Sequence, residues 1–256
     1  MAGKEGVIIQ SVAKAAAILD IFLKKSDIGI SEISDLMGMS KSTAFGLVNT
    51  LVAAGFLEQD TSTKKYRLGL KLFELGSAFE SRMDIRTEAR PFCEELTKKY
   101  NQTVHLAAHS EGDVIYIDKF DIPDFLIVYS QVGRRAPMNC TGVGKAMLAF
   151  LPDEYIKKYV VNSLAAKTRN SCDTPEKLYA DLELIRKRGY AVDNEEIQPG
   201  LRCVAAPVFS KGGKVAAAVS LSAMANAMPY EDIEKIAADV MLCAGNISRL
   251  LGVGGK

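Results

Sequence analysis

Small polar side chains gather in the last third of the chain, where they could form a binding site. Ser220 and Ser222 lie two positions apart in an apolar run, so a strand would point both hydroxyls to one face. Asp193 ends another short apolar run and adds a hydrogen-bond acceptor. Buried hydroxyls need partners, and a few polar groups among apolar walls suit a small ligand. Because small polar residues are common in strands, this set does not define a site by itself.

The segment 142–145 (GVGK) resembles part of a phosphate-binding P-loop but fails the full pattern. That pattern requires a glycine where Asn139 stands and Ser or Thr where Ala146 stands. We instead expect the glycines to open a helix over residues 145–150. Backbone N–H groups at such a start can hold a carboxylate.

Neither a catalytic centre nor a metal site is predicted. Cys203 lies in an apolar strand with no histidine nearby in sequence, so nothing indicates a nucleophile paired with a base. On a straight strand, His105 and His109 would lie about 13 Å apart. One zinc ion binds its nitrogen ligands at about 2.1 Å, so the two cannot share it. We interpret both as structural histidines and expect no cofactor.

Composition restricts the class of protein. The chain has 256 residues, of which 48% are hydrophobic and 25% charged, and its net charge of +1 points to no polyanionic partner. Its five cysteines are widely spaced and form no CxxC pair, so we expect a reducing, cytoplasmic location. The apolar stretch 12–23 contains Lys14 and Asp20 and is too short to cross a membrane.

The first 69 residues predict a helix-turn-helix. Apolar spacing indicates a helix over about 11–24, a second that opens at Ser31 and is closed by Gly38, and a third capped by Ser40 that runs to about residue 54. The three-residue connection between the second and third helices is typical of this motif.

The third helix has two unequal faces. Its apolar stripe should face the other helices and comprises Ala44, Leu47, Val48, Leu51 and Val52. The opposite face is small and polar and would fit a major groove about 12 Å wide. We expect DNA contacts from Ser40, Lys41, Ser42, Thr43, Phe45, Gly46 and Asn49.

A β-hairpin over residues 56–68 follows the third helix. Its second arm carries Lys64, Lys65 and Arg67, which a winged motif would place against DNA phosphates. Three short helices also occur in bundles that bind no DNA. Moreover, residues 1–69 hold eight Lys or Arg against seven Asp or Glu, so DNA binding requires these charges to be segregated by face.

The rest of the chain predicts an α+β domain. Residues 70–82 and 85–100 read as helices, with a kink or break at Pro91. Alternating patterns and turn residues then indicate antiparallel strands with helices at their margins. The expected strands are 104–109, 114–119, 125–131, 190–193, 201–209 and 215–222, and the expected helices are 175–188 and 229–251.

Several motifs together resemble the IclR (isocitrate lyase regulator) family of bacterial transcription factors. In the N-terminal third they are 9–12 (IQSV), 30–33 (ISEI), 40–43 (SKST), 51–52 (LV), 55–57 (GFL) and 66–69 (YRLG). In the second half they are 189–190 (GY), Asp193, 200–203 (GLRC), 205–207 (AAP) and 220–222 (SLS). The resemblance implies a winged helix-turn-helix over 1–69, a linker helix over 70–84, a GAF-like effector domain over 85–252 and a flexible tail over 253–256.

The resemblance also implies a function and a site. It implies a ligand-responsive regulator, more often a repressor, that binds operator DNA as a homodimer or homotetramer, without a membrane, metal or catalytic role. Its small organic acid effector would bind Asp193, Cys203, Ser220, Ser222 and the backbone of Gly142 and Val143. One departure stands out: Gly46 replaces a residue that is often basic in the family.

Two other functions remain open at this point. One is a small-molecule enzyme with an accessory helical domain, and the other is a scaffold whose N-terminal helices bind proteins. Turnover of a bound acid would favour the first, and failure to bind any duplex at low salt would favour the second.

Overall fold

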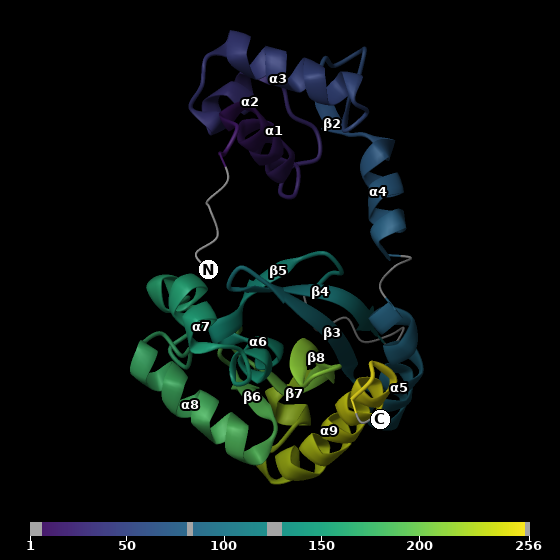
Figure 1. Ribbon diagram of the computed structural model, residues 1–256, viewed down its shortest axis with the longest axis vertical. Helices are drawn as coiled ribbons and strands as arrows, with labels where there is room; N and C mark the ends of the chain where they lie inside the picture. The colour runs from purple at the N-terminus through teal and green to yellow at the C-terminus, as the bar shows by residue number, and fades with distance from the viewer. Residues whose placement is uncertain (1–6, 81–83, 122–129, 254–256) are drawn as a thin grey trace. The chain divides into compact units, whose positions relative to one another are not determined.

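The computed structural model describes residues 7–80, 84–121 and 130–253 (Figure 1). It divides into two compact units, residues 1–83 and 84–256. None of the described helices combines the length and the apolar character that a membrane span requires.

The first unit is a three-helix core followed by a short hairpin and one further helix. Its elements are α1 (Gln10–Ile21), α2 (Ile30–Met37), α3 (Lys41–Ala53), β1 (Leu57–Gln59), β2 (Tyr66–Leu68) and α4 (Leu70–Glu80). Ile18, Ile33 and Val48 meet in the core, where Tyr66 closes it from the hairpin. An isolated bridge between Ile28 and Tyr66 ties the loop after α1 to the hairpin. The core thus fixes both α3 and the hairpin.

The helix-turn-helix prediction is confirmed, with corrections at the helix ends. Gly38 closes α2 in the left-handed conformation at φ 59°, and Ser40 caps α3. The predicted cap at Ser31 is wrong: Gly29 precedes the first residue of α2, Ile30, because the Ile30 side chain already packs against the core. The first helix ends at Ile21 rather than near residue 24.

The second unit is built on a six-stranded antiparallel sheet in the order β5-β4-β3-β8-β7-β6. The strands are β3 (Thr103–Ser110), β4 (Asp113–Phe120), β5 (Arg135–Pro137), β6 (Ala191–Asn194), β7 (Leu201–Ser210) and β8 (Lys214–Met224). The α-helices are α5 (Asp84–Tyr100), α6 (Gly142–Leu148), α7 (Asp153–Tyr159), α8 (Pro175–Arg188) and α9 (Ile233–Leu250). Short 3-10 turns lie at Met138–Cys140 (η1), Val161–Ser163 (η2), Ala225–Ala227 (η3) and Tyr230–Asp232 (η4).

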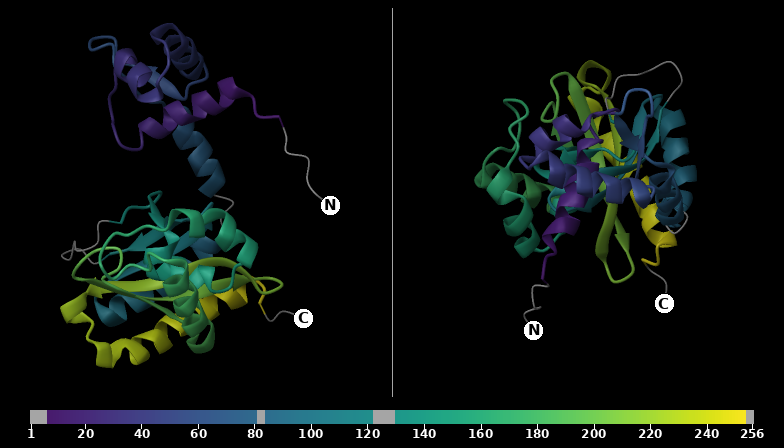
Figure 2. Two further views of the ribbon diagram at one scale, coloured as in Figure 1. Left: turned by 90° about the vertical axis from the view of Figure 1, so that its left-hand side faces the viewer. Right: turned by 90° about the horizontal axis from the view of Figure 1, so that it is seen from above.

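Helices cover the two faces of this sheet. Figure 1 and the left view of Figure 2 show α9 beside α5 and along the sheet, where α9 packs mainly on β7 and α5 on β3. The other face carries α6, which packs on β7, β8 and β6 and in turn supports α8. The core of that side joins Ala107, Ala205 and Ala218 of the sheet to Met147 of α6 and Leu182 of α8. Small sheet residues therefore let α6 lie close to the strands.

Three predictions of local structure need correction or fall outside the description. The helix α5 continues through Pro91 without the break that was one of the two predicted outcomes, because its packing against α9 and β3 outweighs the one hydrogen bond that proline removes. The predicted helix over 145–150 begins at Gly142, because the Thr141 hydroxyl accepts a hydrogen bond from the Gly144 N–H and caps it. Most of the predicted strand 125–131 lies outside the described residues.

Candidate functional site

The outer face of α3 presents the side chains that the sequence predicted. The seven predicted residues from Ser40 to Asn49 are all exposed, and the Phe45 ring is 50% exposed. Ala44, Val48 and Leu51 are buried on the opposite face. A Cβ atom added at Gly46 would meet no atom within 4 Å, so the middle of this face is open. The face can therefore approach a flat or grooved partner closely.

The N-terminal end of α3 holds a cluster of hydroxyls. The Ser40 hydroxyl accepts a hydrogen bond from the Thr43 N–H at 3.2 Å and lies 3.0 Å and 2.8 Å from the hydroxyls of Ser42 and Thr43. Lys41 is exposed beside them. Helix N-termini and such hydroxyls are common contacts of DNA phosphates.

The hairpin places its cations in different situations. Lys64 and Lys65 are exposed at the end of the turn, and Lys64 has the left-handed φ of 59°. Arg67 is exposed but pairs across the strands with Glu58 at 3.3 Å. The Asp60 carboxylate accepts hydrogen bonds from the N–H groups of Ser62 and Thr63 and shapes the turn. An exposed ion pair is weak, so Arg67 can exchange Glu58 for a phosphate.

The second unit gathers most of the predicted effector residues at one end of the sheet. In register, Asp193 of β6 pairs with Cys203 of β7, which pairs with Ser222 of β8. Gly142, the first residue of α6, covers this row: a Cβ atom there would lie 3.4 Å from the Cβ of Cys203 and 3.7 Å from that of Asp193. One site is thus formed by three adjacent strands and a helix start.

Two predicted residues lie beside this row. Ser220 is buried one step along β8, opposite Ala205 of β7 and His105 of β3. The Val143 side chain packs in the hydrophobic core between α6 and the sheet, so only its backbone could meet a ligand. The first N–H groups of a helix have no partner within the helix.

Asp193 is the most unusual group of the site. Its carboxyl is buried, and one oxygen, Oδ1, accepts a hydrogen bond from the Glu196 N–H at 2.8 Å. The other oxygen, Oδ2, has no hydrogen-bond partner among the described residues. Burial, and next the charge of Glu196, raise the pKa of Asp193 to about 7. Near neutral pH this carboxyl can therefore either accept or donate a hydrogen bond.

The sequence did not predict that His105 and Tyr116 would border the site. His105 Nδ1 lies 3.3 Å from the Ser222 hydroxyl, and its Nε2 faces the Ser130 hydroxyl. Its ring packs on Tyr116 with the centroids 5.1 Å apart. Burial lowers the pKa of His105 to about 3, so its ring is neutral. His105 lies beside Ser222 because β3 pairs with β8. No motif in the sequence predicts that these two strands are neighbours.

The Cys203 thiol of this site is not an activated nucleophile. Burial raises the pKa of the Cys203 thiol well above its usual value, and the carboxyl of Asp193 raises it further. All five cysteines are free and buried. A protonated thiol packed beside a carboxyl can contact a ligand but is not poised to attack one.

One group of side chains has the composition of a metal site. Ligand atoms of Cys172, Asp181 and Glu196 lie within 4.8 Å of one another. The ammonium of Lys145 already lies against both carboxylates, 2.6 Å from Asp181 Oδ2. Because this buried cation neutralises the carboxylates, we interpret the group as an ion-pair cluster.

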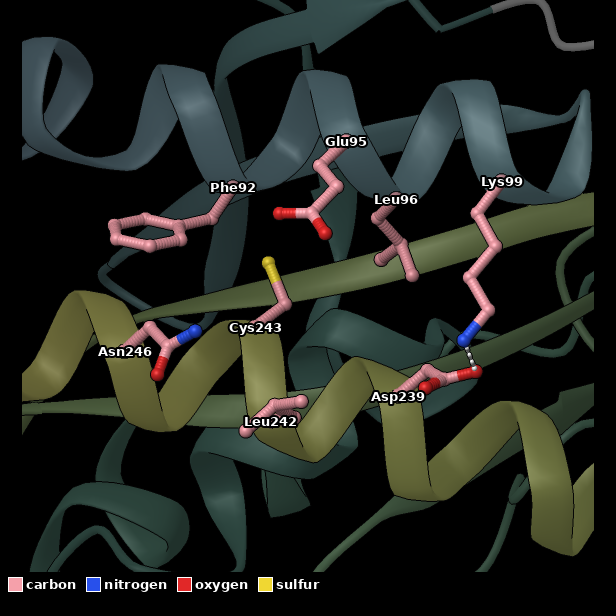
Figure 3. A pocket seen from close by; sticks show the side chains of 8 residues that line it. All are labelled: Phe92, Glu95, Leu96, Lys99, Asp239, Leu242, Cys243 and Asn246. Atoms are coloured by element: carbon pink, nitrogen blue, oxygen red, sulfur yellow. Dashed lines mark ion pairs between the residues drawn. The ribbon is translucent and has the colours of Figure 1, made fainter.

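A cavity of about 120 Å³ lies between α5 and α9, on the other face of the sheet (Figure 3). Lys99 and Asp239 form an ion pair at 2.7 Å across its rim. The Cys243 thiol points toward α5, where a hydrogen bond with it raises the pKa of the Cys93 thiol. Lys99 and Asp239 thus satisfy each other, while Glu95 and Asn246 also line the cavity.

Comparison with known proteins shows similarity over nearly the whole chain. The profile described as "IclR helix-turn-helix domain" matches residues 11–61, and that of "Bacterial transcriptional regulator IclR C-terminal" matches residues 78–249. The Escherichia coli transcriptional regulator XynR is 36% identical over 252 residues, which cover 96% of this chain and 98% of XynR.

Two further relatives agree. The transcriptional repressor AllR of Salmonella paratyphi A is 32% identical over 95% of this chain and 90% of its own length. A crystal structure of an IclR protein from Thermotoga maritima has 36% sequence identity and a TM-score of 0.72, over 95% of this chain and 99% of that chain.

Proposed function

The chain belongs to the IclR family of bacterial transcriptional regulators, and we propose that it is a repressor controlled by a small organic acid. Both family profiles match, and its relatives carry the names of transcriptional regulators rather than enzymes. The chain is therefore a ligand-responsive DNA-binding regulator. What we propose goes further: that the chain represses transcription, that its ligand is a small organic acid, and that particular residues bind the DNA and the ligand.

The DNA interface of this proposal is the outer face of α3 together with the hairpin. The hydroxyls and the lysine at the start of α3 would bind phosphates, and Phe45 and Asn49 would reach base edges in the major groove. Lys64, Lys65 and Arg67 would bind neighbouring phosphates. The openness at Gly46 supports a close approach of the α3 backbone to the bases.

The effector proposal is carried by one observation: the buried Oδ2 atom of Asp193 has no partner among the described residues. A buried polar atom without a partner is costly, and a ligand would remove that cost. A protonated Asp193 could donate to a carboxylate oxygen, while Ser222 and the first N–H groups of α6 supply further donors. Apolar neighbours would hold the rest of the acid.

Repression and pairing of subunits complete the proposal. Repression is supported by the relative AllR, which is named a repressor. A homodimer, or a tetramer made of two such dimers, is supported by α4, which exposes Leu70, Phe73 and Phe79 by 67% to 75%. Two-fold pairing would set two α3 helices on successive turns of a palindromic operator. A regulator of this kind would act in the cytoplasm, where the DNA is.

The test is the fluorescence anisotropy of DNA from upstream of the protein's own coding region, titrated with the protein and then with a panel of small carboxylic acids. We expect binding that weakens with salt and that one acid changes by about 5- to 150-fold. Asp193→Ala and Ser222→Ala should bind DNA normally but respond less to that acid, because each removes a hydrogen-bonding side chain from the site. Ser210→Ala, at the β7–β8 turn, is the matched control and should respond as the wild type does. An undiminished response of Asp193→Ala would place the effector elsewhere.

A further inference from the structure

A buried ion-pair cluster lies directly behind the effector site. Lys145 of α6 is 1% exposed, and its Nζ donates to Asp181 Oδ2 at 2.6 Å, to the Val192 carbonyl at 2.9 Å and to Glu196 Oε1. Burial opposes the charge of Lys145, but the carboxylates of Glu196 and Asp181 outweigh burial and raise its pKa. The ammonium is therefore charged and has three acceptors for its three protons.

This cluster connects the two elements that flank the effector site, α6 and β6. Lys145 lies three residues after Gly142, which covers Asp193 and Cys203. Its partner Glu196 follows β6 and uses its own N–H to hold Asp193 Oδ1 at 2.8 Å. One chain of contacts thus runs from α6 through Lys145 and Glu196 to Asp193. Asp181 contacts Lys145 from α8 and, as far as the described residues show, makes no hydrogen bond or ion pair with Asp193.

Glu196 and Lys145, which belong to this chain of contacts, also influence the ionisation of Asp193. After burial itself, the Glu196 carboxylate is the largest influence that keeps Asp193 protonated, and Lys145 acts in the opposite direction. Burial raises the pKa of Glu196, and the adjacent Lys145 opposes that rise. Because Glu196 accepts from an ammonium, it carries the negative charge that disfavours a second one on Asp193.

The remaining groups around Asp193 contribute no charge near pH 7. Burial raises the pKa of Tyr116 of β4, of Cys203 of β7 and, to about 12, of Cys140 of η1. His105 of β3 is neutral. The more distant charged groups are Asp181 and Arg188 of α8, which lie 3.9 Å apart, and Lys167, which faces Cys140. After burial, the charges of Glu196 and Lys145 therefore have the largest influence on the ionisation of Asp193.

We propose that Glu196, anchored by Lys145, is a positioning residue of the effector site: its N–H holds one oxygen of Asp193, its carboxylate disfavours a second negative charge there, and the other oxygen of Asp193 is left free to donate to the effector. This proposal rests on the effector site proposed above and narrows its ligand to an anionic carboxylate that accepts a hydrogen bond from Asp193. An ionised Asp193 would repel such an anion, so ionisation of Asp193 switches the site off.

The test is the titration of the full-length protein labelled with ¹³C at aspartate side-chain carboxyls. The Asp193 signal is the one that disappears in Asp193→Asn. In the wild type we expect it to titrate near pH 7. In Glu196→Gln, which keeps the shape and the backbone N–H, we expect its pKa to fall by about one unit or more, a tenfold change in the ratio of protonated to ionised Asp193.

Asp181→Asn is the matched control because it also removes one carboxylate from Lys145 but does not touch Asp193. In Asp181→Asn the pKa of Asp193 should stay at its wild-type value. A wild-type Asp193 that titrates near its ordinary 3.8 would overturn the proposal, whatever the variants do. Equal shifts in Glu196→Gln and Asp181→Asn would overturn it too, because a merely structural role of the cluster predicts them.

A second readout separates this proposal from the effector site on which it rests. For an acid that changes DNA affinity, the effect should decline above pH 7 in the wild type and from a lower pH in Glu196→Gln. If the titrations behave as expected but Asp193→Ala responds to the acid normally, the effector site is wrong while the control of the Asp193 charge stands. If the acid response needs Asp193 but Glu196→Gln leaves both pH profiles unchanged, only the role of the pair is wrong.

Discussion

At the residue scale, the main feature is the ionisation of Asp193. Its carboxyl is buried in the second unit, and no described cation forms an ion pair with it. Its pKa in the folded chain is raised from 3.8 to about 7. Below pH 4 the carboxyl is protonated in both the folded and the unfolded chain and does not affect stability. Above that, the unfolded chain loses the proton first, so the free energy of unfolding declines as the pH rises toward 7.

Asp193→Asn should remove this decline. We expect the wild type to lose roughly 1 kcal/mol of stability, relative to Asp193→Asn, for each pH unit between 4 and 7. Urea unfolding of both proteins at several pH values measures the difference. Parallel stability curves would mean that Asp193 ionises as easily in the folded chain as in water.

The cations of the hairpin are a second feature at this scale. Each phosphate that a protein cation neutralises adds about 0.9 to the slope of log affinity against log salt. Lys64→Ala combined with Arg67→Ala should therefore weaken binding to any DNA duplex and lower that slope by roughly 2. The affinity for any DNA duplex can be measured by fluorescence anisotropy at several low salt concentrations. A specific operator is not needed, because phosphate contacts do not depend on the DNA sequence.

Lys157→Ala is the control for this pair. Lys157 is an exposed lysine that pairs with Asp153 in the second unit, and its loss should leave the slope unchanged. Equal slopes in all three proteins would exclude the hairpin from the interface.

At the scale of elements, the seating of α6 depends on glycine. A Cβ atom at Gly144 would lie 2.4 Å from the Met138 carbonyl oxygen and 2.5 Å from the Met138 Cα. Backbone cannot yield as a flexible side chain would, so α6 and η1 would have to separate. We expect Gly144→Ala to cost at least about 2 kcal/mol of stability.

Gly245→Ala is the matched comparison within α9, where the added atom would meet nothing within 4 Å. Alanine is the better helix former, so this variant should gain about 0.5–1 kcal/mol. Thermal unfolding of both variants measures the contrast. A Gly144→Ala protein as stable as the wild type would show that α6 can shift freely against the turn before it.

At the scale of the whole molecule, α4 leaves apolar surface without a described partner. Phe73 is 75% exposed and Phe79 is 67% exposed. Large apolar side chains exposed in this way occur at interaction sites, and a second copy of the chain would bury them. Phe73→Ser should therefore raise the dissociation constant of a homodimer, which sedimentation velocity over a range of concentrations would measure.

Leu184→Ser on α8 is the control, because Leu184 is also exposed, by 54%, but lies in the other unit. It should leave the sedimentation unchanged. If Phe73→Ser sediments as the wild type does, the proposed pairing through α4 is wrong.

Local features could be read from the sequence because they depend on neighbouring residues. Gly38 and Ser40 mark the helix ends around the turn, and Thr174 with Pro175 marks the start of α8. The exposed face of α3 follows from helical spacing, and the common face of Ser220 and Ser222 follows from strand alternation. The end of a short apolar run added Asp193 to these serines as an acceptor, whereas Cys203 joined the predicted site only through the family resemblance.

Contacts between distant segments were decided only by the tertiary structure. Strand order brings His105 to Ser222 across 117 positions, and packing of α6 brings Lys145 to Glu196 across 51. From spacing alone, Lys145 was interpreted only as part of an incomplete P-loop pattern, and Glu196 was not predicted to have a role. The reason is physical: alternation and capping depend on residues a few positions apart, whereas the protonation of a buried carboxyl depends on which charges folding places beside it.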